Sequence, residues 1–225
     1  MAISILIKAI LIIIISYLLG SISFALLIGK CFYGIDIRQQ GSGNLGATNA
    51  FRVLGVLPGI LVFLGDVLKG VFAVGLANFF FRGAPTIFSF CLSQNTAFSH
   101  SSLVDSIIVI LAGFAVIAGH NWPVFLKFSG GKGIATSTGV LLVLAPKTTI
   151  ILFLIWLVIL ILTKYVSLGS VTIAVMLPFF MVSFYPGNYP YIIFSLIVTV
   201  VAIYKHRSNI KRLLKGDESK IGEGS

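Results

Sequence analysis

Long apolar stretches with almost no charged residues constrain this chain more than any other feature. The stretch 168–184 carries no charge, and 54–81 carries two charged residues. Only 10% of the 225 residues are charged, compared with about a quarter in an ordinary soluble domain. A backbone in lipid must satisfy its own hydrogen bonds, as helices and closed barrels do. Barrel strands alternate apolar and polar residues, whereas these stretches are continuous. We therefore expect an all-α integral membrane protein, with residues 1–225 forming a single polytopic domain.

These stretches predict seven transmembrane helices, at roughly 5–28, 54–81, 104–118, 134–145, 149–162, 168–184 and 191–204. A crossing helix needs about 20 residues. The fourth and fifth helices are shorter than this and are separated by a break at Pro146 and Lys147. Tilted helices, longer helices and a re-entrant hairpin all remain open for this pair. The first stretch is long enough to cross, which favours an uncleaved helix over a signal peptide.

The basic residues predict the orientation of these helices. Three connections and the tail, all on one side of a seven-helix topology, hold twelve of the sixteen Lys and Arg residues: Lys30, Arg38, Arg52, Lys127, Lys132, Lys164, Lys205, Arg207, Lys211, Arg212, Lys215 and Lys220. Positive residues collect on the cytoplasmic side. The N-terminus is therefore predicted to be external and the C-terminus cytoplasmic.

Composition also indicates which partners to expect. The net charge of +10 follows from the cytoplasmic loops and suits anionic lipid or phosphate, so we expect no nucleic acid partner. Cys31 and Cys91 fall on opposite sides of the predicted membrane, which argues against a disulfide between them. No His, Cys, Asp or Glu cluster has the spacing of metal ligands. We expect neither a metal ion nor a cofactor.

A glycine-rich segment with a lysine lies near the middle of the chain, between two apolar stretches. The segment Gly119–Thr136 contains His120, and Gly130, Gly131 and Gly133 surround Lys132. Glycine lets the backbone come close to a ligand, and consecutive N–H groups in such a turn form an anion-binding nest. Phosphate binding and a flexible loop facing lipid headgroups both fit this segment when it is considered alone.

Two more polar groups fall on the predicted cytoplasmic side. One is Gly41–Arg52, where Gly41 and Gly43 alternate with polar residues; the other combines Ser167 with His206 and Asn209. Hydroxyl, amide, Arg, Lys and His groups all donate hydrogen bonds to phosphate oxygens. The predicted second helix also carries Asp66 and Lys69 on one face, which is either a functional pair or a self-neutralising packing pair.

These residues also carry a resemblance to a known family. GSGNLGATNAFR at 41–52, GHNWPVFLKFSGGKGIAT at 119–136 and KHRSNIKRLLKG at 205–216 closely resemble the three signature segments of the bacterial acyl-phosphate:glycerol-3-phosphate acyltransferases. The resemblance implies seven transmembrane helices and a site facing the cytoplasm. It also implies transfer of a fatty acyl group from acyl phosphate to the sn-1 hydroxyl of glycerol 3-phosphate, which gives lysophosphatidic acid. Glycerol 3-phosphate, acyl phosphate and membrane lipids are the implied partners of a chain that we expect to be monomeric.

The resemblance assigns roles residue by residue. Catalytic roles fall on Ser42, Lys132, His206 and Asn209. Substrate or phosphate binding falls on Gly41, Gly43, Asn44, Thr48, Asn49, Arg52, Lys69, His120, Gly130, Gly131, Gly133 and Ser167. Acyl phosphate is an activated anhydride, so no covalent nucleophile is required. His120 and His206 are the conventional general bases, but acidic residues are scarce on the predicted cytoplasmic side, with Asp36 in a region flanking the first segment and Asp66 in a predicted helix. We therefore favour a phosphate oxygen of the substrate as the base.

Three other interpretations compete with this one. His100 and Asp105 form an HxxxxD pattern typical of acyl-CoA-dependent acyltransferases, but the predicted topology places it on the external face. A secondary transporter of an organic phosphate would suit seven helices with glycine breaks, although the chain shows no inverted repeat. A scaffold with an interfacial tail helix would explain Ile210, Leu213 and Leu214 but neither glycine-rich segment.

Overall fold

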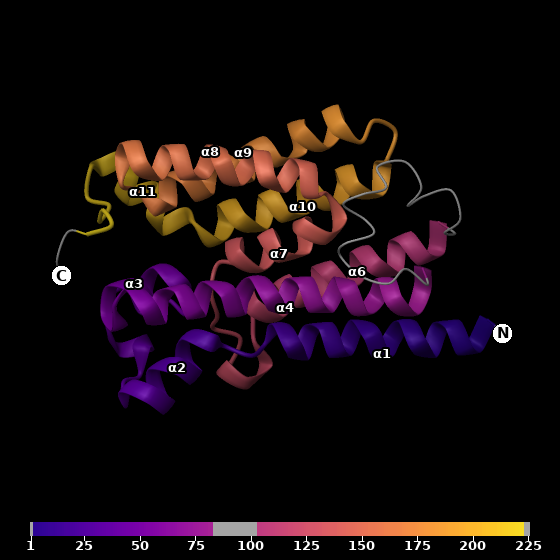
Figure 1. The fold of residues 1–225 in the computed structure, drawn as a ribbon, viewed down its shortest axis with the longest axis horizontal. Helices are drawn as coiled ribbons and strands as arrows, with labels where there is room; N and C mark the ends of the chain where they lie inside the picture. The colour runs from indigo at the N-terminus through magenta and orange to yellow at the C-terminus, as the bar shows by residue number, and fades with distance from the viewer. Residues whose placement is uncertain (1, 83–102, 223–225) are drawn as a thin grey trace. The chain divides into compact units, whose positions relative to one another are not determined.

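A computed structural model describes residues 2–82 and 103–222, and every regular element in these ranges is helical (Figure 1). The helices are α1 (Ala2–Gly20), α2 (Phe24–Tyr33), η1 (Ile37–Gln39), α3 (Ala47–Leu54), α4 (Val56–Arg82), α6 (Leu103–Asn121), η2 (Val124–Leu126), α7 (Ile134–Leu144), α8 (Pro146–Thr163), α9 (Val166–Phe184), α10 (Tyr189–Lys205) and α11 (Arg207–Lys215). Cys91 and His100 lie outside the described residues. The predicted all-α fold is confirmed.

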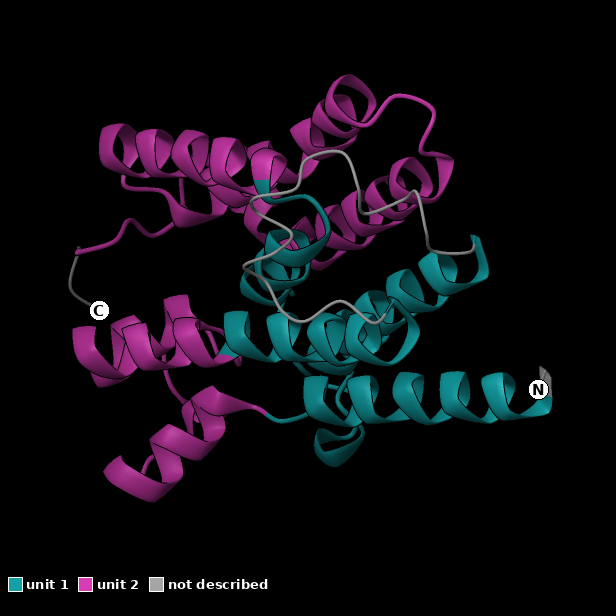
Figure 2. Cartoon of the chain, turned by 45° about the vertical axis from the view of Figure 1, so that its right-hand side comes forward, with its two compact units in different colours: residues 1–22, 66–146 teal, residues 23–65, 147–225 magenta. Residues whose placement is uncertain are grey.

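The helices form two compact units (Figure 2). Unit 1 comprises Met1–Ile22 and Asp66–Pro146, and unit 2 comprises Ser23–Gly65 and Lys147–Ser225. Helix α4 begins in unit 2 and ends in unit 1. The organisation of residues 1–225 as a single membrane domain stays a prediction.

Glycine residues let the helices of unit 1 approach closely. A side chain at Gly20 of α1 would collide with the α6 backbone, and one at Gly119 of α6 would collide with the α1 backbone. Gly70 of α4 and Gly139 of α7 show the same reciprocal contact. Small residues at helix interfaces allow the close packing that replaces the hydrophobic effect inside a membrane. These two glycine pairs therefore join α1 to α6 and α4 to α7.

The predicted first helix, 5–28, is wrong as a single helix. Helix α1 ends at Gly20, and α2 begins at Phe24 after Ser23, whose side chain accepts a hydrogen bond from the Leu26 N–H. A serine at this position favours a new helix start because its hydroxyl satisfies a backbone donor of the first turn. The break leaves the last carbonyls of α1 available to a partner from elsewhere in unit 1.

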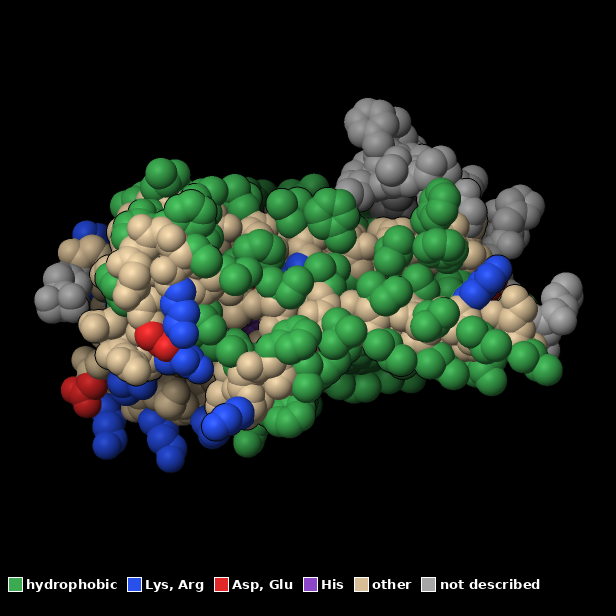
Figure 3. Space-filling model, turned by 90° about the horizontal axis from the view of Figure 1, so that it is seen from below, with side chains coloured by type: hydrophobic (Ala, Val, Ile, Leu, Met, Phe, Trp, Pro, Cys, Tyr) green, Lys and Arg blue, Asp and Glu red, His purple; other side chains and the backbone are tan. Residues whose placement is uncertain are grey.

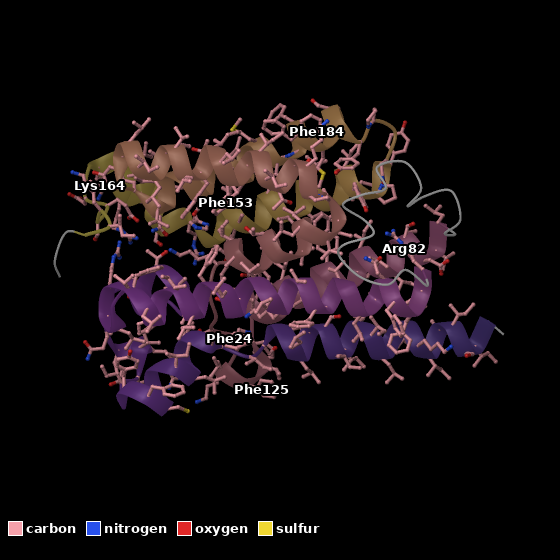
Figure 4. All side chains as sticks on the ribbon, viewed as in Figure 1. Phe24, Arg82, Phe125, Phe153, Lys164 and Phe184 are labelled. Atoms are coloured by element: carbon pink, nitrogen blue, oxygen red, sulfur yellow. The ribbon has the colours of Figure 1, made fainter. Side chains whose placement is uncertain are left out.

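Unit 2 contains the remaining helices. Phe24 of α2 packs against the α4 backbone at Gly65, where a Cβ atom would overlap its ring (Figure 4). Helices α9 and α10 pack together, with the Thr199 hydroxyl donating to the Ala174 carbonyl at 2.7 Å. The segment Gly41–Arg52, predicted as part of a polar connection, runs into α3, and the predicted turn at 164–167 gives way to α9 at Val166.

The outer surface of the helices is apolar, as lipid contact requires. Large side chains such as Leu6 on α1, Phe72 on α4 and Leu162 on α8 are more than half exposed, and hydrophobic side chains dominate the face shown in Figure 3. In the described ranges, five helices are long and apolar enough to cross a membrane, or six if α10 and α11, bent by 59°, count as one. Helix α7 has 11 residues, or about 16 Å. Seven crossings are thus not confirmed by helix length alone.

Candidate functional site

The central glycine-rich segment forms a tight loop that leads into α7. Gly133 adopts φ of 83° at the N-terminus of α7 and makes no side-chain capping bond. The Gly131 N–H donates to the His120 carbonyl at 3.0 Å. Both glycines are buried, while Lys132 between them is partly exposed. The N-terminus of α7 directly follows this loop, and the N-terminus of a helix attracts anions.

A buried ionic cluster lies beside this loop in unit 1. The Lys69 ammonium lies 2.8 Å from Oδ1 of Asp66 and 2.8 Å from Nδ1 of His120. It also donates to the carbonyls of Gly20 and Ile22, each at 3.1 Å. Asp66 and Lys69 are each 2% exposed. The predicted pairing of Asp66 with Lys69 is therefore present, and the structure adds His120 and the end of α1 to it.

The Gly41–Arg52 segment of unit 2 is held together by a buried asparagine. Asn49 accepts a hydrogen bond from the Ser42 N–H at 2.9 Å and donates to the carbonyls of Ile37 and Gln40 at 3.2 and 3.1 Å. Gly41 has a positive φ of 57°, and a side chain there would overlap the Asn49 amide. The Asn49 side chain thus shapes this loop, and it leaves the Ser42 side chain exposed.

A carboxylate from the tail gathers three donors in unit 2. Oε1 of Glu218 accepts hydrogen bonds from the Ser167 hydroxyl at 2.8 Å and from the Asn209 amide at 2.7 Å, and Oε2 accepts one from Nε of Arg212 at 2.7 Å. Burial alone raises the pKa of a carboxyl group. The hydrogen bonds from Asn209, Ser167 and Arg212 outweigh burial here and hold the pKa of Glu218 below its ordinary value.

The tail that carries Glu218 is fastened at two further points. The Ile221 N–H donates to the Lys164 carbonyl at 2.9 Å, in the connection between α8 and α9 (Figure 4). Nη2 of Arg52 donates to the Ser219 carbonyl at 3.1 Å. Three of the predicted site residues, Ser167, Asn209 and Arg52, therefore contact this tail segment, 217–222.

His206 lies between α10 and α11, where the helix axis bends by 59°. It is 4% exposed, and its Nδ1 lies 2.8 Å from the Ala202 carbonyl. A carbonyl only accepts hydrogen bonds, so Nδ1 carries a proton and, in the neutral ring, Nε2 carries the lone pair. The backbone of α10 thus fixes which nitrogen of His206 can act as a base.

Asp36, the acid next to the first glycine-rich segment, is paired. Nε and Nη2 of Arg38 donate to its two carboxylate oxygens at 2.9 and 2.6 Å, and Lys30 lies 3.5 Å away. These hydrogen bonds from Arg38 hold the pKa of the Asp36 carboxyl well below its usual range. Asp36 is therefore ionised at neutral pH and is not a proton donor.

The structure brings the predicted residues together within each unit. Unit 1 contains the loop with Lys132, together with Lys69 and His120, and unit 2 contains the Gly41–Arg52 segment with Ser167, His206 and Asn209. The sequence interpretation missed Glu218. Its signal was an acidic residue within a basic tail, only two residues beyond the third resembling segment. In residues 2–82 and 103–222, no three His, Cys, Asp or Glu side chains could hold a metal ion.

The helices and these polar clusters define an integral membrane protein with buried groups suited to anions. A model of the glycerol-3-phosphate acyltransferase family matches residues 10–216. The glycerol-3-phosphate acyltransferase 2 of Moorella thermoacetica is 43% identical over 212 residues, covering 94% of this chain and 97% of that protein. The glycerol-3-phosphate acyltransferase of Desulforamulus reducens is 44% identical over 217 residues, covering 96% and 97%.

Solved structures agree with these relatives. The crystal structure of PlsY, an integral membrane glycerol 3-phosphate acyltransferase, in its glycerol 3-phosphate form has a TM-score of 0.79 at 38% identity and 96% coverage of both chains. The lysophosphatidic acid form has a TM-score of 0.77. The chain belongs to the glycerol-3-phosphate acyltransferase family and is an acyltransferase of the membrane, which confirms the family and the class of reaction predicted from its three segments.

Proposed function

We propose that this chain transfers a fatty acyl group from acyl phosphate to the sn-1 hydroxyl of glycerol 3-phosphate, releasing lysophosphatidic acid and inorganic phosphate. The observation that carries the proposal is the near full-length likeness to PlsY in its glycerol 3-phosphate form, at 38% identity. The product would enter phospholipid biosynthesis. Membrane lipid and the two phosphorylated substrates are the partners, and the protein acts as a monomer.

The topology belongs to the same proposal. Helices α1, α4, α6, α7, α8, α9 and α10 provide seven crossings, with the N-terminus external and the C-terminus cytoplasmic. The asymmetry of the basic residues supports this orientation, because Lys and Arg collect on the cytoplasmic side. If α7 and α8 instead form a re-entrant hairpin, the remaining segments keep their sides. The proposed location is the bacterial inner membrane, with substrates arriving from the cytoplasm.

In unit 1, the Gly130–Gly133 loop is the proposed binding site for a substrate phosphate. Helix α7 begins after Gly133, which has no side chain to cap its first turn, and Lys132 adds a positive charge. Both substrates are anions, so a loop of this kind offsets charge that would otherwise keep them apart. Lys132 also stabilises the developing oxyanion or the leaving phosphate.

In unit 2, the proposal assigns substrate contacts to Ser42, Arg52, Ser167, His206 and Asn209. Glu218 bears on this assignment because it orients the Ser167 and Asn209 side chains through hydrogen bonds of 2.8 and 2.7 Å. Arginine offers two parallel donors to a phosphate. The remaining segment residues, Gly41, Gly43, Asn44 and Thr48, are proposed to line the path of the bound phosphate.

The reaction needs no covalent enzyme intermediate. The sn-1 hydroxyl oxygen attacks the acyl carbonyl, the bond between the carbonyl and the phosphate oxygen breaks, and phosphate leaves. We propose that a phosphate oxygen of the substrate takes the hydroxyl proton, because the ion pair with Arg38 lowers the pKa of Asp36 and so makes its carboxylate a poor proton acceptor. Holding the hydroxyl against the carbonyl then supplies much of the rate enhancement.

The test is acyl transfer by the purified protein in lipid. Palmitoyl phosphate and glycerol 3-phosphate are supplied, phosphate and lysophosphatidic acid are measured, and palmitoyl-CoA is the alternative donor. We expect turnover with palmitoyl phosphate that is lost in Lys132→Ala and kept in Lys127→Ala, an exposed lysine of the same segment. Turnover with palmitoyl-CoA alone would show that the donor is wrong. A folded protein that uses neither donor would refute the reaction.

A further inference from the structure

The protons of the Lys69 ammonium are all engaged inside unit 1. An ammonium group has three protons and no acceptor. They point to the carbonyls of Gly20 and Ile22 at 3.1 Å and to Nδ1 of His120 at 2.8 Å. Asp66 neutralises the charge at 2.8 Å. This leaves Lys69 with no proton for a substrate oxygen, although its charge and its position in a transmembrane helix suggest a ligand.

The same contact favours one tautomer of His120. Nδ1 lies 2.8 Å from the Lys69 ammonium and 3.4 Å from Oδ1 of Asp66, and the shorter contact fixes its role. Because an ammonium only donates, Nδ1 of His120 accepts, and the ring proton is on Nε2. A second proton on the ring would bring two N–H donors face to face. In this tautomer, the Nδ1 lone pair of His120 faces the Lys69 ammonium.

The other edge of the His120 ring lies against the glycine loop. A Cβ atom at Gly131 would overlap Nε2 of His120, and all three of its nearest atoms belong to that ring. The backbone of His120 contacts the same residue, because its carbonyl accepts the Gly131 N–H at 3.0 Å. Residue 120 thus touches the loop through both its side chain and its carbonyl.

We propose that Asp66 and Lys69 lock His120 in one tautomer, and that His120 sets the path of the Gly130–Gly133 loop. All three are positioning residues for the reaction, and none is a substrate ligand or general base. The inference rests on the proposed function in one respect only, that the loop binds a substrate phosphate. Its structural part, a loop supported by a buried ionic cluster, can be tested without activity.

The kinetic test uses His120→Asn in the full-length protein with palmitoyl phosphate as donor. Asparagine keeps an acceptor for Lys69 but leaves a gap beneath the loop. We expect kcat/KM for glycerol 3-phosphate to fall roughly 10- to 100-fold, because the substitution misplaces the loop that carries Lys132, with an unchanged pH profile. A loss of about 10²- to 10⁴-fold in kcat, with unchanged KM and a missing limb in the pH profile, would overturn the proposal.

A rescue experiment separates positioning from catalysis more sharply. Gly131→Ala places a methyl group against the His120 ring and should lower kcat/KM for glycerol 3-phosphate. Adding His120→Asn removes the ring and should raise the kcat/KM of Gly131→Ala by roughly tenfold, the opposite of its effect in the wild-type background. A general base cannot produce this reversal of sign. If the second substitution only adds to the defect, the proposed contact does not control the loop.

The cluster itself is tested by Asp66→Asn combined with Lys69→Met, which removes both charges together. Hydrogen exchange of the Gly131 amide reports on the loop whether or not the protein is active. In the double variant, we expect this amide to exchange at least about tenfold faster than in the wild type. The control is Lys147→Met, whose lysine lies over the Phe184 ring, and there the amide should keep the wild-type exchange rate. Unchanged exchange in the folded double variant refutes the cluster's role even if the protein proves to catalyse another reaction.

If this double variant does not fold, the Gly131→Ala rescue decides the question instead, because both of its substitutions keep Asp66 and Lys69 in place. A wild-type protein without acyl transfer would refute the proposed function alone. Exchange at Gly131 would then still confirm or refute the positioning network.

Discussion

Removing the Glu218 carboxylate should release the tail segment 217–222. In Glu218→Ala, the Ser167 hydroxyl and the Asn209 amide lose an acceptor at 2.8 and 2.7 Å. Ser167 and Asn209 are 7% and 5% exposed. Depriving a buried donor of its acceptor costs about 1–3 kcal/mol, so these two contacts together contribute about 2–6 kcal/mol. Arg212 is 42% exposed, so screening reduces its contribution to at most about 1 kcal/mol.

The lower end of this range already predicts a large change in tail opening. About 2 kcal/mol corresponds to roughly a 30-fold shift in an equilibrium. Hydrogen exchange at the Ile221 amide measures this opening directly, because its N–H donates to the Lys164 carbonyl within the closed tail. We expect this amide to exchange at least about tenfold faster in Glu218→Ala than in the wild type.

Asp217→Ala is the matched control for this experiment, because it removes the same charge from the neighbouring, exposed position. It should leave exchange at Ile221 unchanged. Turnover should fall in Glu218→Ala and not in the control, because the donors that Glu218 orients are proposed substrate contacts. Equal exchange at Ile221 in the wild type and in both variants would refute the reasoning, since the carboxylate would then not hold the tail.

Three further outcomes follow. Folding lowers the pKa of Glu218, so the ionised carboxylate stabilises the closed tail fully above the ordinary carboxyl pKa, and this stabilisation is lost as the pH falls below that value. Hydrogen exchange at the Ile221 amide, corrected for its intrinsic rate, should therefore rise below about pH 4.5. Glu218→Gln should abolish this pH dependence. Gly20→Val should lower the thermal unfolding temperature of the protein because the α6 backbone fills that space, whereas Gly75→Ala, with open space around it, should leave that temperature unchanged or raise it. Arg52→Lys should raise the KM for glycerol 3-phosphate roughly tenfold, because lysine lacks the planar fork of donors; an unchanged KM would contradict a substrate contact there.

The break after Gly20 shows where sequence patterns stop being informative. Residues 5–28 read as one apolar helix, and hydropathy carries no signal for an interruption. What permits the break is Lys69, which supplies donors to the carbonyls of Gly20 and Ile22 from 49 and 47 residues away. Inside a membrane, an unsatisfied carbonyl costs several kcal/mol. Only tertiary packing decides whether a donor is present to satisfy it.

Asn49 and Glu218 illustrate the same limit for the candidate site. An asparagine in a glycine-rich polar segment suggests a ligand contact, yet its hydrogen bonds to the Ser42 N–H and to the Ile37 and Gln40 carbonyls join it to the backbone of its own loop. Glu218 offered a weak signal, because nothing local links it to Ser167, 51 residues away. Residue type shows which groups can bind phosphate. Whether such a group is instead hydrogen-bonded inside the protein depends on neighbouring residues that only the fold brings close.

By itself, the sequence determined the class of the protein and its chemistry. Continuous apolar stretches leave helices as the structure that satisfies a backbone in lipid, and three polar segments specify the family because close approach to phosphate demands those residue types. The tertiary structure decided how these segments are supported. It placed His120 between Lys69 and Gly131, and Glu218 between Ser167 and Asn209. Such contacts join residues that are distant in the chain, and their geometry is fixed by helix packing rather than by any local pattern.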